Sequence, residues 1–431
     1  MSTDELVARH KAVLPDWMPL YYDEPIEIVS GSGCRVTDAS GRSYLDFFGG
    51  VLTNMLGYDI AEVREAVERQ LRTGVVHTST LYLIRQQVEL AEKIARLSGI
   101  PDARVFFTNS GTEANEAALL VATNHRRSNQ ILAVRNSYHG RSYAAMGVTG
   151  NRGWSASALN PLRVSWLHSG DRLRGLLSRL GADEQIDAAV EDLREVLATE
   201  TSGDVAALIA EPVQGVGGFV HPPDGLFGAW KKVLDESGIL LISDEVQTGW
   251  GRTGEHFWGY QAHDVIPDLL TFAKGIGNGF ALAGVVGRAE VMNQVPAISF
   301  STFGGNPIST AAGNAVLDYL LDHDLQANAA RVGAILGDGL RSAVGAYDIV
   351  GEVRGKGLML GVELVQPGGR QPNPAATARV FEECKRGGLL VGKGGLYGNV
   401  VRMGPPLTLT EEEAKEGLEI LVAAITAVER S

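Results

Sequence analysis

The sequence contains very little cysteine. Cys34 and Cys384 are the only two in 431 residues. Two isolated cysteines form neither a disulfide framework nor a metal-binding spacing, so we expect a protein of the reducing cytoplasm. No cluster of histidine, aspartate and glutamate has metal-ligand spacing either, so no metal is expected.

Long apolar runs and an excess of positive charge are also absent. No apolar stretch reaches the roughly 18 residues of a membrane-spanning helix. The chain begins MSTDELVARHKAVLPDW, which mixes acids with bases and lacks the apolar core of a secretory signal. The formal net charge of −13 disfavours nucleic acid and anionic membranes as partners, because both attract positive surfaces.

The composition that is present suits a large globular protein, with 45% hydrophobic and 21% charged residues. The length favours two lobes. Residues 26–48 alternate and turn as antiparallel strands do. From about residue 60 to 300, apolar strands alternate with helical stretches such as 61–74 and 86–99, which predicts a parallel sheet wrapped by helices.

The pattern after residue 310 predicts helices over 309–344, 377–388 and 411–430, with a β-hairpin over 349–365. We therefore expect an α/β fold of two domains. The large domain would span residues 61–309, with a mostly parallel central sheet. The small α+β domain would combine both chain ends, residues 1–60 and 310–431.

Four predicted strands end in polar or charged residues. RVFF is followed by the run Thr108 to Thr112, VAALIA by Glu211, ILLIS by Asp244, and LLTFA by Lys274. Each strand is apolar enough to be buried on both faces. Ligands of open α/β sheets bind beyond the carboxyl ends of the strands, so these residues predict one site.

The stretch TNSGTEANEAALLVA predicts a phosphate seat. Ser110 or Thr112 can cap the helix that follows, and Gly111 lets its backbone approach a ligand closely. Free N–H groups and the helix dipole at such an end attract anions. The alternative is an ordinary helix cap.

Asp244 and Lys274 have two interpretations each. A buried carboxylate needs a partner, which could be a protonated ring nitrogen or an arginine such as Arg252. A buried lysine acquires a lowered pKa and becomes a nucleophilic amine able to form a Schiff base. The alternative for Lys274 is a structural ion pair or a side chain that reaches solvent.

Together, a phosphate seat, a carboxylate for a ring nitrogen and an amine for an aldehyde are what pyridoxal 5′-phosphate requires. Rival motifs fail. GIGNGFALAG lacks the third glycine of a dinucleotide fingerprint, and no phosphate-binding G-x-x-x-x-G-K-[ST] loop occurs. HGRS and GDGLRS do not complete the G-x-S-x-G pattern of a nucleophile elbow.

Over nearly its whole length the chain resembles the class III aminotransferases, of the fold-type I pyridoxal-phosphate group. The motifs are TNSGTEANEAAL, SYHGRS, IAEPVQGVGGF, ISDEVQTGWGRTG, PDLLTFAKGIGNG and STFGGNP. HFWGYQAHDVIPD, VRGKGLMLGVELV and LLVGKGGLYGNVVRMGPPLTLT are most similar to the alanine–glyoxylate aminotransferases of the second type.

The resemblance implies a role for each matching residue. Lys274 would form the Schiff base, Asp244 would pair with the pyridine nitrogen, and Gln247 would approach the ring hydroxyl. The remaining cofactor-binding positions would be Ser110, Gly111 and Thr112 at the phosphate, and Tyr138 stacked on the ring with His139 beside it. Thr302 would reach the phosphate of the partner's cofactor, which implies a homodimer and leaves pairing into a tetramer open. Tyr138, His139 and Thr302 could instead be structural residues.

Two further residues concern the substrate. The resemblance implies that Arg402 grips the α-carboxylate, a task suited to the planar guanidinium fork. Glu211 would pair with Arg402 and swing away when a carboxylate binds. The alternative is a permanent Glu211–Arg402 salt bridge.

The sequence thus predicts an aminotransferase that moves an amino group from an amino acid or ω-amino donor to pyruvate, glyoxylate or 2-oxoglutarate. A phospho-lyase acting on a phosphorylated amino alcohol and an amino-acid racemase of the same fold are the alternatives. A third alternative is a cofactor-binding transcription regulator with an inactive site. Such a regulator would need a basic DNA-binding segment, and we find no such segment in the sequence.

Overall fold

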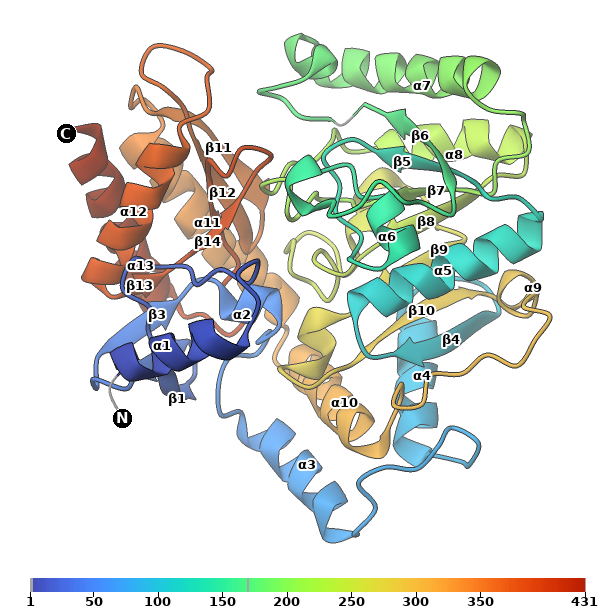
Figure 1. Cartoon of the computed structure of the whole chain (residues 1–431), viewed down its shortest axis with the longest axis horizontal. Coiled ribbons are helices and arrows are strands. Elements are labelled where there is room, and N and C mark those ends of the chain that lie inside the picture. The colour runs from blue at the N-terminus through green and yellow to red at the C-terminus, as the bar shows by residue number, and fades with distance from the viewer. Residues whose placement is uncertain (1–2, 169, 431) are drawn as a thin grey trace.

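The computed structural model describes residues 3–168 and 170–430, and Figure 1 shows the chain as a large α/β body beside a group of smaller sheets and helices. A seven-stranded sheet forms the centre of the larger body. Its strands in spatial order are β4 (Ala103–Thr108), β10 (Ala283–Arg288), β9 (Leu269–Phe272), β8 (Leu240–Asp244), β7 (Ala207–Ala210), β5 (Gln130–Val134) and β6 (Arg163–Leu167).

All strands of this sheet are parallel except β10, which is antiparallel to both its neighbours. The expected mostly parallel sheet is therefore confirmed. The strands β4, β7, β8 and β9 run in one direction, so their carboxyl ends lie at the same edge. The polar residues that follow these four strands are brought to that edge together.

The expectation that all four strands are buried on both faces is correct for β7, β8 and β9, whose residues are all buried. It is wrong for β4. That strand lies at the end of the sheet, where it pairs with β10 alone, and Arg104 is exposed there.

Helices cover both faces of the large sheet. The helices α5 (Gly111–Arg126), α6 (Tyr143–Gly147) and α9 (Ala289–Met292) pack on one face. The helices α7 (Ala182–Thr199) and α8 (Leu226–Glu236) pack on the other, where Trp230 is fully buried. Ser110 begins α5 as its N-cap, because its side chain accepts a hydrogen bond from the Glu113 amide.

Two four-stranded sheets lie outside the large one. The first consists of β1 (Ile28–Ser32), β2 (Arg35–Asp38), β3 (Ser43–Asp46) and β13 (Leu389–Leu390). The second consists of β11 (Val350–Lys356), β12 (Met359–Leu364), β15 (Val400–Met403) and β14 (Gly392–Gly394). The expected antiparallel strands near the N-terminus and the expected hairpin, β11–β12, are confirmed. Leu389 pairs with Leu45, so segments from both chain ends share one sheet, seen in Figure 1 as blue beside red.

The remaining helices follow the periodicity of the sequence in most cases. They are α2 (Gly49–Leu52), α3 (Ala61–Arg72), α4 (Arg85–Leu97), α10 (Pro307–Asp322), α11 (Leu325–Val344), α12 (Pro374–Gly387) and α13 (Glu411–Glu429). Short 3₁₀ helices span Arg152–Trp154, Leu176–Arg179, Gly259–His263 and Lys274–Gly277. The proposed domain boundaries stay a prediction.

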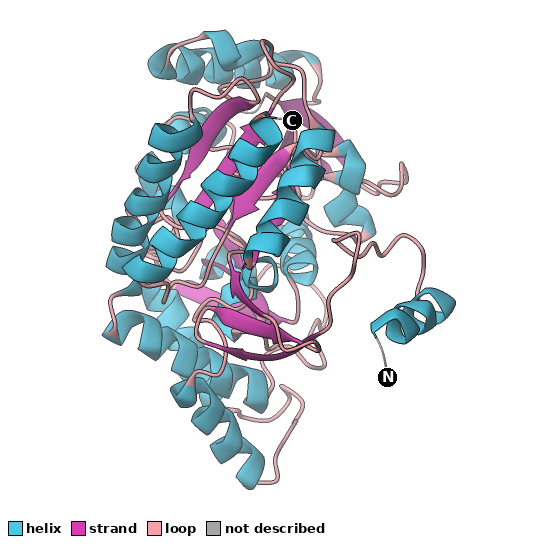
Figure 2. Cartoon of the chain, turned by 90° about the vertical axis from the view of Figure 1, so that its left-hand side faces the viewer, coloured by secondary structure: helices cyan, strands magenta, loops and turns pink. Residues whose placement is uncertain are grey.

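The helix α1 (Thr3–Val13) was not expected from the sequence, and none of its residues is buried. Figure 2 shows it standing apart from the rest of the molecule at the end of a loop. Among the helices of residues 3–168 and 170–430, none combines the length and apolarity needed to cross a bilayer.

Candidate functional site

Lys274 lies at the end of β9, in the left-handed backbone region with φ of 52°. Burial lowers the pKa of its amine, and nearby Arg402 acts in the same direction, while Asp244 and Glu211 oppose the shift. Within the described chain, no hydrogen bond or ion pair engages Lys274 Nζ. The amine is therefore free to act as a nucleophile.

The glycines after Lys274 allow close packing. A Cβ atom on Gly275 would lie 2.7 Å from Met55 Sδ, so no other residue fits there without a shift. Gly279 has φ of +99°, a conformation that favours glycine. Between them, Asn278 Oδ1 accepts a hydrogen bond from the Leu56 amide at 2.8 Å, which ties the turn to the N-terminal segment.

Asp244 ends β8 and is only 3% exposed. Its Oδ2 atom lies 2.7 Å from His139 Nδ1 and accepts a hydrogen bond from Asn115 Nδ2 at 2.8 Å. The alternative in which Asp244 pairs with Arg252 is wrong. Arg252 instead donates to two backbone carbonyls, those of Leu358 at 3.2 Å and Pro405 at 2.8 Å.

The residues of the predicted phosphate seat, Ser110, Gly111 and Thr112, lie at the start of α5, and their role at a phosphate stays a prediction. Ser110 caps the helix by accepting from the Glu113 amide at 3.2 Å, so the ordinary-cap interpretation also applies to it. A Cβ atom on Gly111 would lie 3.0 Å from Val246 Cγ1, and Thr112 Oγ1 accepts from the Arg141 amide at 3.4 Å. The start of this helix lies beside Lys274, because a Cβ atom on Gly111 would lie 3.6 Å from that of Ala273, the residue before Lys274.

Tyr138 connects this edge to Glu211. The Tyr138 amide donates to Glu211 Oε1 at 2.8 Å, and the Tyr138 ring meets Trp154 edge to face at 5.5 Å. Burial raises the pKa of the Tyr138 hydroxyl. His139, the next residue, is buried and contacts Asp244, so both residues of the SYHG motif belong to the cluster.

Glu211 and Arg402 do not form the ion pair that the sequence suggested. Glu211 Oε2 accepts from the Gly215 amide at 2.9 Å, and Arg402 Nη1 donates to the Gly215 carbonyl at 2.8 Å. No ion pair links the two side chains in the described part of the chain. Burial raises the pKa of Glu211 to about 7, with Asp244 adding to the shift and His139 opposing it.

Arg402 is buried in an aromatic enclosure. Its guanidinium carbon lies 5.3 Å from the centre of the Phe219 ring and 5.6 Å from that of Phe48. Arg402 Nε donates to the Lys393 carbonyl at 3.1 Å, and Tyr21, whose ring stacks on that of Phe48 at 5.7 Å, lies close to the guanidinium. Burial lowers the pKa of Arg402, although the side chain stays a cation because that pKa is so high in water.

Gln247 and Thr302 differ in their relation to this cluster. Gln247 is buried beside the loop at Gly215, where an added Cβ atom would lie 2.1 Å from Gln247 Nε2. Thr302 is exposed and lies beside the cluster, not within it, because its neighbour Ser301 accepts from Asn109 Nδ2 at 3.0 Å. The structure therefore brings together every predicted site residue except Thr302.

Sequence reasoning missed Asn115 and Tyr21. Asn115 donates to Asp244, and its Oδ1 accepts from Thr271 Oγ1 at 2.7 Å. A polar residue on an alanine-rich, buried helix face was the signal that could have revealed it. Tyr21 has no such signal, because only the folded chain brings residue 21 to Arg402.

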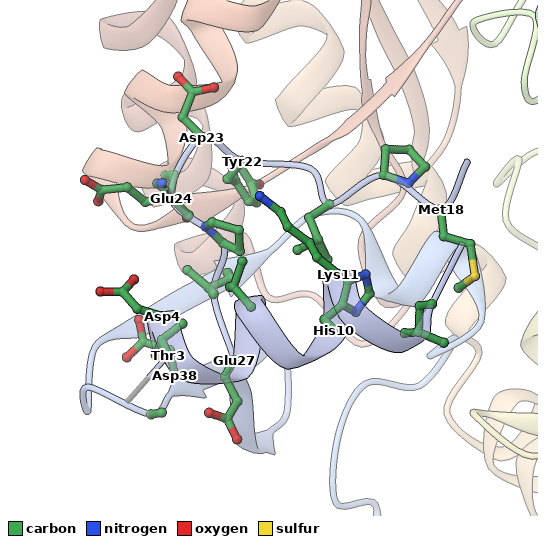
Figure 3. Close-up of a pocket in the computed structure, with 18 of the residues that line it drawn as sticks. Thr3, Asp4, His10, Lys11, Met18, Tyr22, Asp23, Glu24, Glu27 and Asp38 are labelled. Carbon is green, nitrogen blue, oxygen red and sulfur yellow. Dashed lines mark hydrogen bonds between the residues drawn. The ribbon is translucent and has the colours of Figure 1, made fainter. Parts of the chain in front are cut away.

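A separate hollow lies elsewhere in the molecule. It has a volume of about 1090 Å³ and lies between α1 and the N-terminal sheet, where His10 and Lys11 face Asp38 and Glu24 across it (Figure 3). None of the predicted site residues lines it. It therefore has no part in the cluster around Lys274.

The cluster fits pyridoxal 5′-phosphate on its own geometry. Two buried atoms within it, His139 Nε2 and Gln247 Oε1, have no hydrogen-bond partner, which is costly unless a ligand satisfies them. A free amine, a buried carboxylate and a helix N-terminus meet at one sheet edge. These are the groups needed for the aldehyde, ring nitrogen and phosphate.

Comparison with known proteins agrees with this geometry. The family described as aminotransferase class-III matches residues 20–425. The chain is 41% identical over 425 residues to the mitochondrial alanine–glyoxylate aminotransferase 2 homolog 2 of Arabidopsis thaliana, which covers 96% of this chain and 85% of that protein.

Two solved structures are also similar over almost the full length. An amine transaminase from an uncultivated Pseudomonas species, in its PLP-bound form, is 33% identical with a TM-score of 0.88, covering 94% of this chain and 95% of that one. A phospholyase from Arthrobacter in complex with phosphoethanolamine is 34% identical with a TM-score of 0.89, covering 98% and 99%.

Proposed function

Because this chain belongs to the class-III aminotransferase family and is a PLP-dependent transaminase, we propose that it moves an amino group from an amino acid or ω-amino donor to an α-keto acid. The acceptor we propose is pyruvate, glyoxylate or 2-oxoglutarate. One observation carries the proposal: the buried cation Arg402 binds the Gly215 carbonyl, and the Gly215 amide binds Glu211, which also accepts from the Tyr138 amide, so a carboxylate-binding group lies in the same cluster as Lys274. A substrate carboxylate at Arg402 would therefore place its α-carbon beside Lys274.

The cofactor would be held by the residues already described. Lys274 would hold its aldehyde carbon, Asp244 its ring nitrogen, and the amides at Gly111 and Thr112 its phosphate. Tyr138 would lie against the ring, with His139 and Gln247 beside it. When bound, pyridoxal 5′-phosphate supplies an aldehyde that takes up amines and a ring that accepts electrons.

Lys274 would act as the proton carrier. Burial favours its uncharged form, so Nζ can take a proton from the amine-bearing carbon of the donor. Nζ then holds that proton for its return in the next step. Asp244 stays in place through His139 and Asn115, and its negative charge favours a protonated ring nitrogen.

Arg402 would bind the carboxylate of each substrate in turn. Its guanidinium now binds the backbone carbonyls of Gly215 and Lys393, both neutral acceptors that a carboxylate can replace. Glu211 is held by the amides of Tyr138 and Gly215 and does not compete for Arg402. A donor without an α-carboxylate could enter while these neutral contacts stay intact.

A phospho-lyase acting on a phosphorylated amino alcohol is the second candidate, supported by the similarity to the Arthrobacter phospholyase. A lyase must bind the substrate phosphate in addition to that of the cofactor. Arg402 is the one buried cation that we find beside Lys274 among the described residues, and it would have to serve that phosphate.

We also propose that the working unit is a homodimer. Two apolar segments, 75–83 and 298–303, lie exposed beside the site and touch through His77 and Phe303, whose rings are 4.8 Å apart. Leu83 is 99% exposed and Ile298 is 92% exposed. Exposed apolar clusters of this kind favour burial against a partner, and Thr302 lies within one of them. The cytoplasmic location stays a prediction.

A panel of amino donors tests the function. The purified enzyme with pyridoxal 5′-phosphate is mixed with each donor, and the absorbance of the bound aldehyde is followed. A transaminase loses this band with a productive donor and regains it when keto acid is added. Release of inorganic phosphate from a phosphorylated amino alcohol, without any need for keto acid, would instead identify a lyase.

A further inference from the structure

The loop of residues 215–219 touches Arg402 at both of its ends. The Gly215 carbonyl accepts from Arg402 Nη1 at 2.8 Å, and the Phe219 ring lies 5.3 Å from the guanidinium carbon. A shift of this loop would move the Gly215 carbonyl and the Phe219 ring together, and both of them contact Arg402. Whatever fixes the loop therefore also fixes the place where Arg402 meets a carboxylate.

The backbone of the loop is strained. Gly218 has φ of +100° and Phe219 has φ of 57°, so two consecutive residues lie in the left-handed region. Phe219 is not a glycine, and such a conformation persists only where the surroundings enforce it. The loop therefore depends on contacts from outside itself.

Arg354 of β11 provides one of these contacts. Its Nε atom donates to the Gly218 carbonyl at 2.9 Å, and a Cβ atom on Gly218 would lie 3.0 Å from Arg354 Nη2. The Gly218 amide donates to the Gly215 carbonyl at 3.1 Å. Three hydrogen bonds thus connect Arg354 to Arg402 through Gly218 and Gly215.

Arg354 is itself fixed by carboxylates. It is 5% exposed, and its Nη1 atom lies 2.6 Å from Glu363 Oε2 and 2.9 Å from Glu352 Oε2. The other oxygen of Glu363 accepts from Arg174 Nε at 2.6 Å and from Asn399 Nδ2 at 3.1 Å. A buried ion pair of this kind adds little net stability but holds its members in one arrangement.

We propose that Arg354 is a positioning residue for the substrate carboxylate. It acts through the 215–219 loop and determines how tightly Arg402 can bind a carboxylate-bearing substrate. When a carboxylate takes Arg402, the Gly215 carbonyl keeps its bond to the Gly218 amide, and Arg354 keeps Gly218 in place. Arg402 can then exchange partners without a rearrangement of the loop. This inference rests on the proposed role of Arg402.

The guanidinium shape matters here more than the charge. Arg354 uses Nε for the loop and Nη1 for the carboxylates at the same time, whereas a lysine has a single ammonium group. Arg354→Lys should therefore keep the neutralising charge at Glu363 and lose the contact with Gly218. Arg354→Met should lose both.

The test compares Arg354→Lys, Arg354→Met and Glu363→Gln holoenzymes with the wild type. Arg288→Lys is the matched control, because Arg288 also pairs with a buried carboxylate, Asp268, at 2.7 Å. Four quantities are measured: KM for pyruvate, kcat, the inhibition constant of propionate, and the thermal midpoint. Propionate has the carboxylate of pyruvate without its reactive carbonyl, so it reports binding alone.

For Arg354→Lys, KM for pyruvate and the inhibition constant of propionate should rise together by about 10-fold to 100-fold, the range for a misplaced binding group. The fall in kcat/KM should come from the higher KM, with kcat little changed. The thermal midpoint should stay near that of Arg288→Lys. Glu363→Gln should show the same selective loss of carboxylate binding even if Arg354→Met fails to fold. Unchanged propionate binding in both Arg354→Lys and Glu363→Gln would overturn the inference.

An Arg402→Ala enzyme separates this inference from the function on which it rests. If Arg402→Ala weakens propionate binding and the Arg354 and Glu363 variants do not, only the role of Arg354 is wrong. If Arg402→Ala leaves propionate binding unchanged, the assignment of Arg402 itself fails, and the proposed function must be revised.

Discussion

Glu211 and Arg402 both bind Gly215 and do not bind each other. The Gly215 amide donates to Glu211 at 2.9 Å, and the Gly215 carbonyl accepts from Arg402 at 2.8 Å. The backbone of Gly215 therefore lies between the buried acid Glu211 and the buried cation Arg402. Neither side chain has to break an ion pair before a substrate carboxylate arrives, which lowers the cost of admitting an α-keto acid after an ω-amino donor.

Arg402→Lys should weaken binding of every α-carboxylate substrate. The ammonium group cannot form the paired hydrogen bonds of a guanidinium, so KM for keto acid should rise by about 10-fold or more with a smaller change in kcat. Steady-state kinetics with pyruvate and glyoxylate measures this. A fall in kcat with KM unchanged would mean that Arg402 serves the chemistry and not the carboxylate.

Glu211→Gln should change how stability depends on pH. Burial raises the pKa of Glu211 to about 7, above its ordinary value of 4.5, so folding favours the protonated form. The raised pKa adds roughly 3 kcal/mol to the free energy of unfolding. This contribution is fully present below pH 4.5 and is lost as the pH rises through 7. Relative to wild type, the glutamine variant should therefore gain stability between pH 4.5 and pH 7.5.

Unfolding of the cofactor-free protein across that range measures the Glu211 effect. Glu236→Gln is the comparison, because exposed Arg194 lowers the pKa of Glu236 and the trend with pH should have the opposite sign. That trend should be small, since the pair is exposed to solvent. Parallel pH profiles for wild type and Glu211→Gln would show that the pKa of Glu211 is the same in the folded and unfolded protein, which would contradict the raised pKa.

Asp244→Asn should reduce kcat by about 100-fold to 1000-fold, the usual loss when a charge aimed at the reacting group is removed. The amide keeps the size of the side chain but not its negative charge beside the ring nitrogen. Glu245→Gln is the neighbouring control. Glu245 accepts from the amides of Gly259 and Tyr260 at 2.8 Å each, so its loss should lower the thermal midpoint while kcat changes far less. Equal losses of kcat in the two variants would contradict the role of Asp244.

Leu83→Asp should disrupt the proposed homodimer. The wild type should show twice the chain mass of 45.9 kDa by light scattering, and the variant should dissociate because the new charge would be buried without a partner. Leu176→Asp provides the control. Leu176 is exposed too, at 75%, but it lies outside the apolar segments 75–83 and 298–303. A wild-type protein that stays monomeric would rule out the shared site suggested for Thr302.

The sequence revealed those parts of the site that depend on local pattern. Asp244 and Lys274 could be found because each ends an apolar strand, and the ends of parallel strands share one edge. Ser110 and Gly111 could be found because a helix start has its own signature. The helices α3, α4 and α10 to α13 and the β11–β12 hairpin followed from periodicity, whereas α1 did not.

Contacts between distant segments could not be predicted in this way. Tyr21 reaches Arg402, and Arg354 reaches Gly218, through the assembly of sheets that carry no pairing signal in a single sequence. The suggested Asp244–Arg252 pair was wrong because two oppositely charged residues near each other in sequence need not point the same way. β4 was expected to be fully buried because composition does not show which strand lies at the end of a sheet.

The most direct test of the account is to map the lysine that holds the cofactor. The enzyme is incubated with pyridoxal 5′-phosphate, reduced with borohydride, digested, and analysed by mass spectrometry for the added phosphopyridoxyl group. The account predicts a single modified peptide containing Lys274, and no modification there in Lys274→Ala. A stoichiometric adduct on any other lysine of the wild-type enzyme would contradict it.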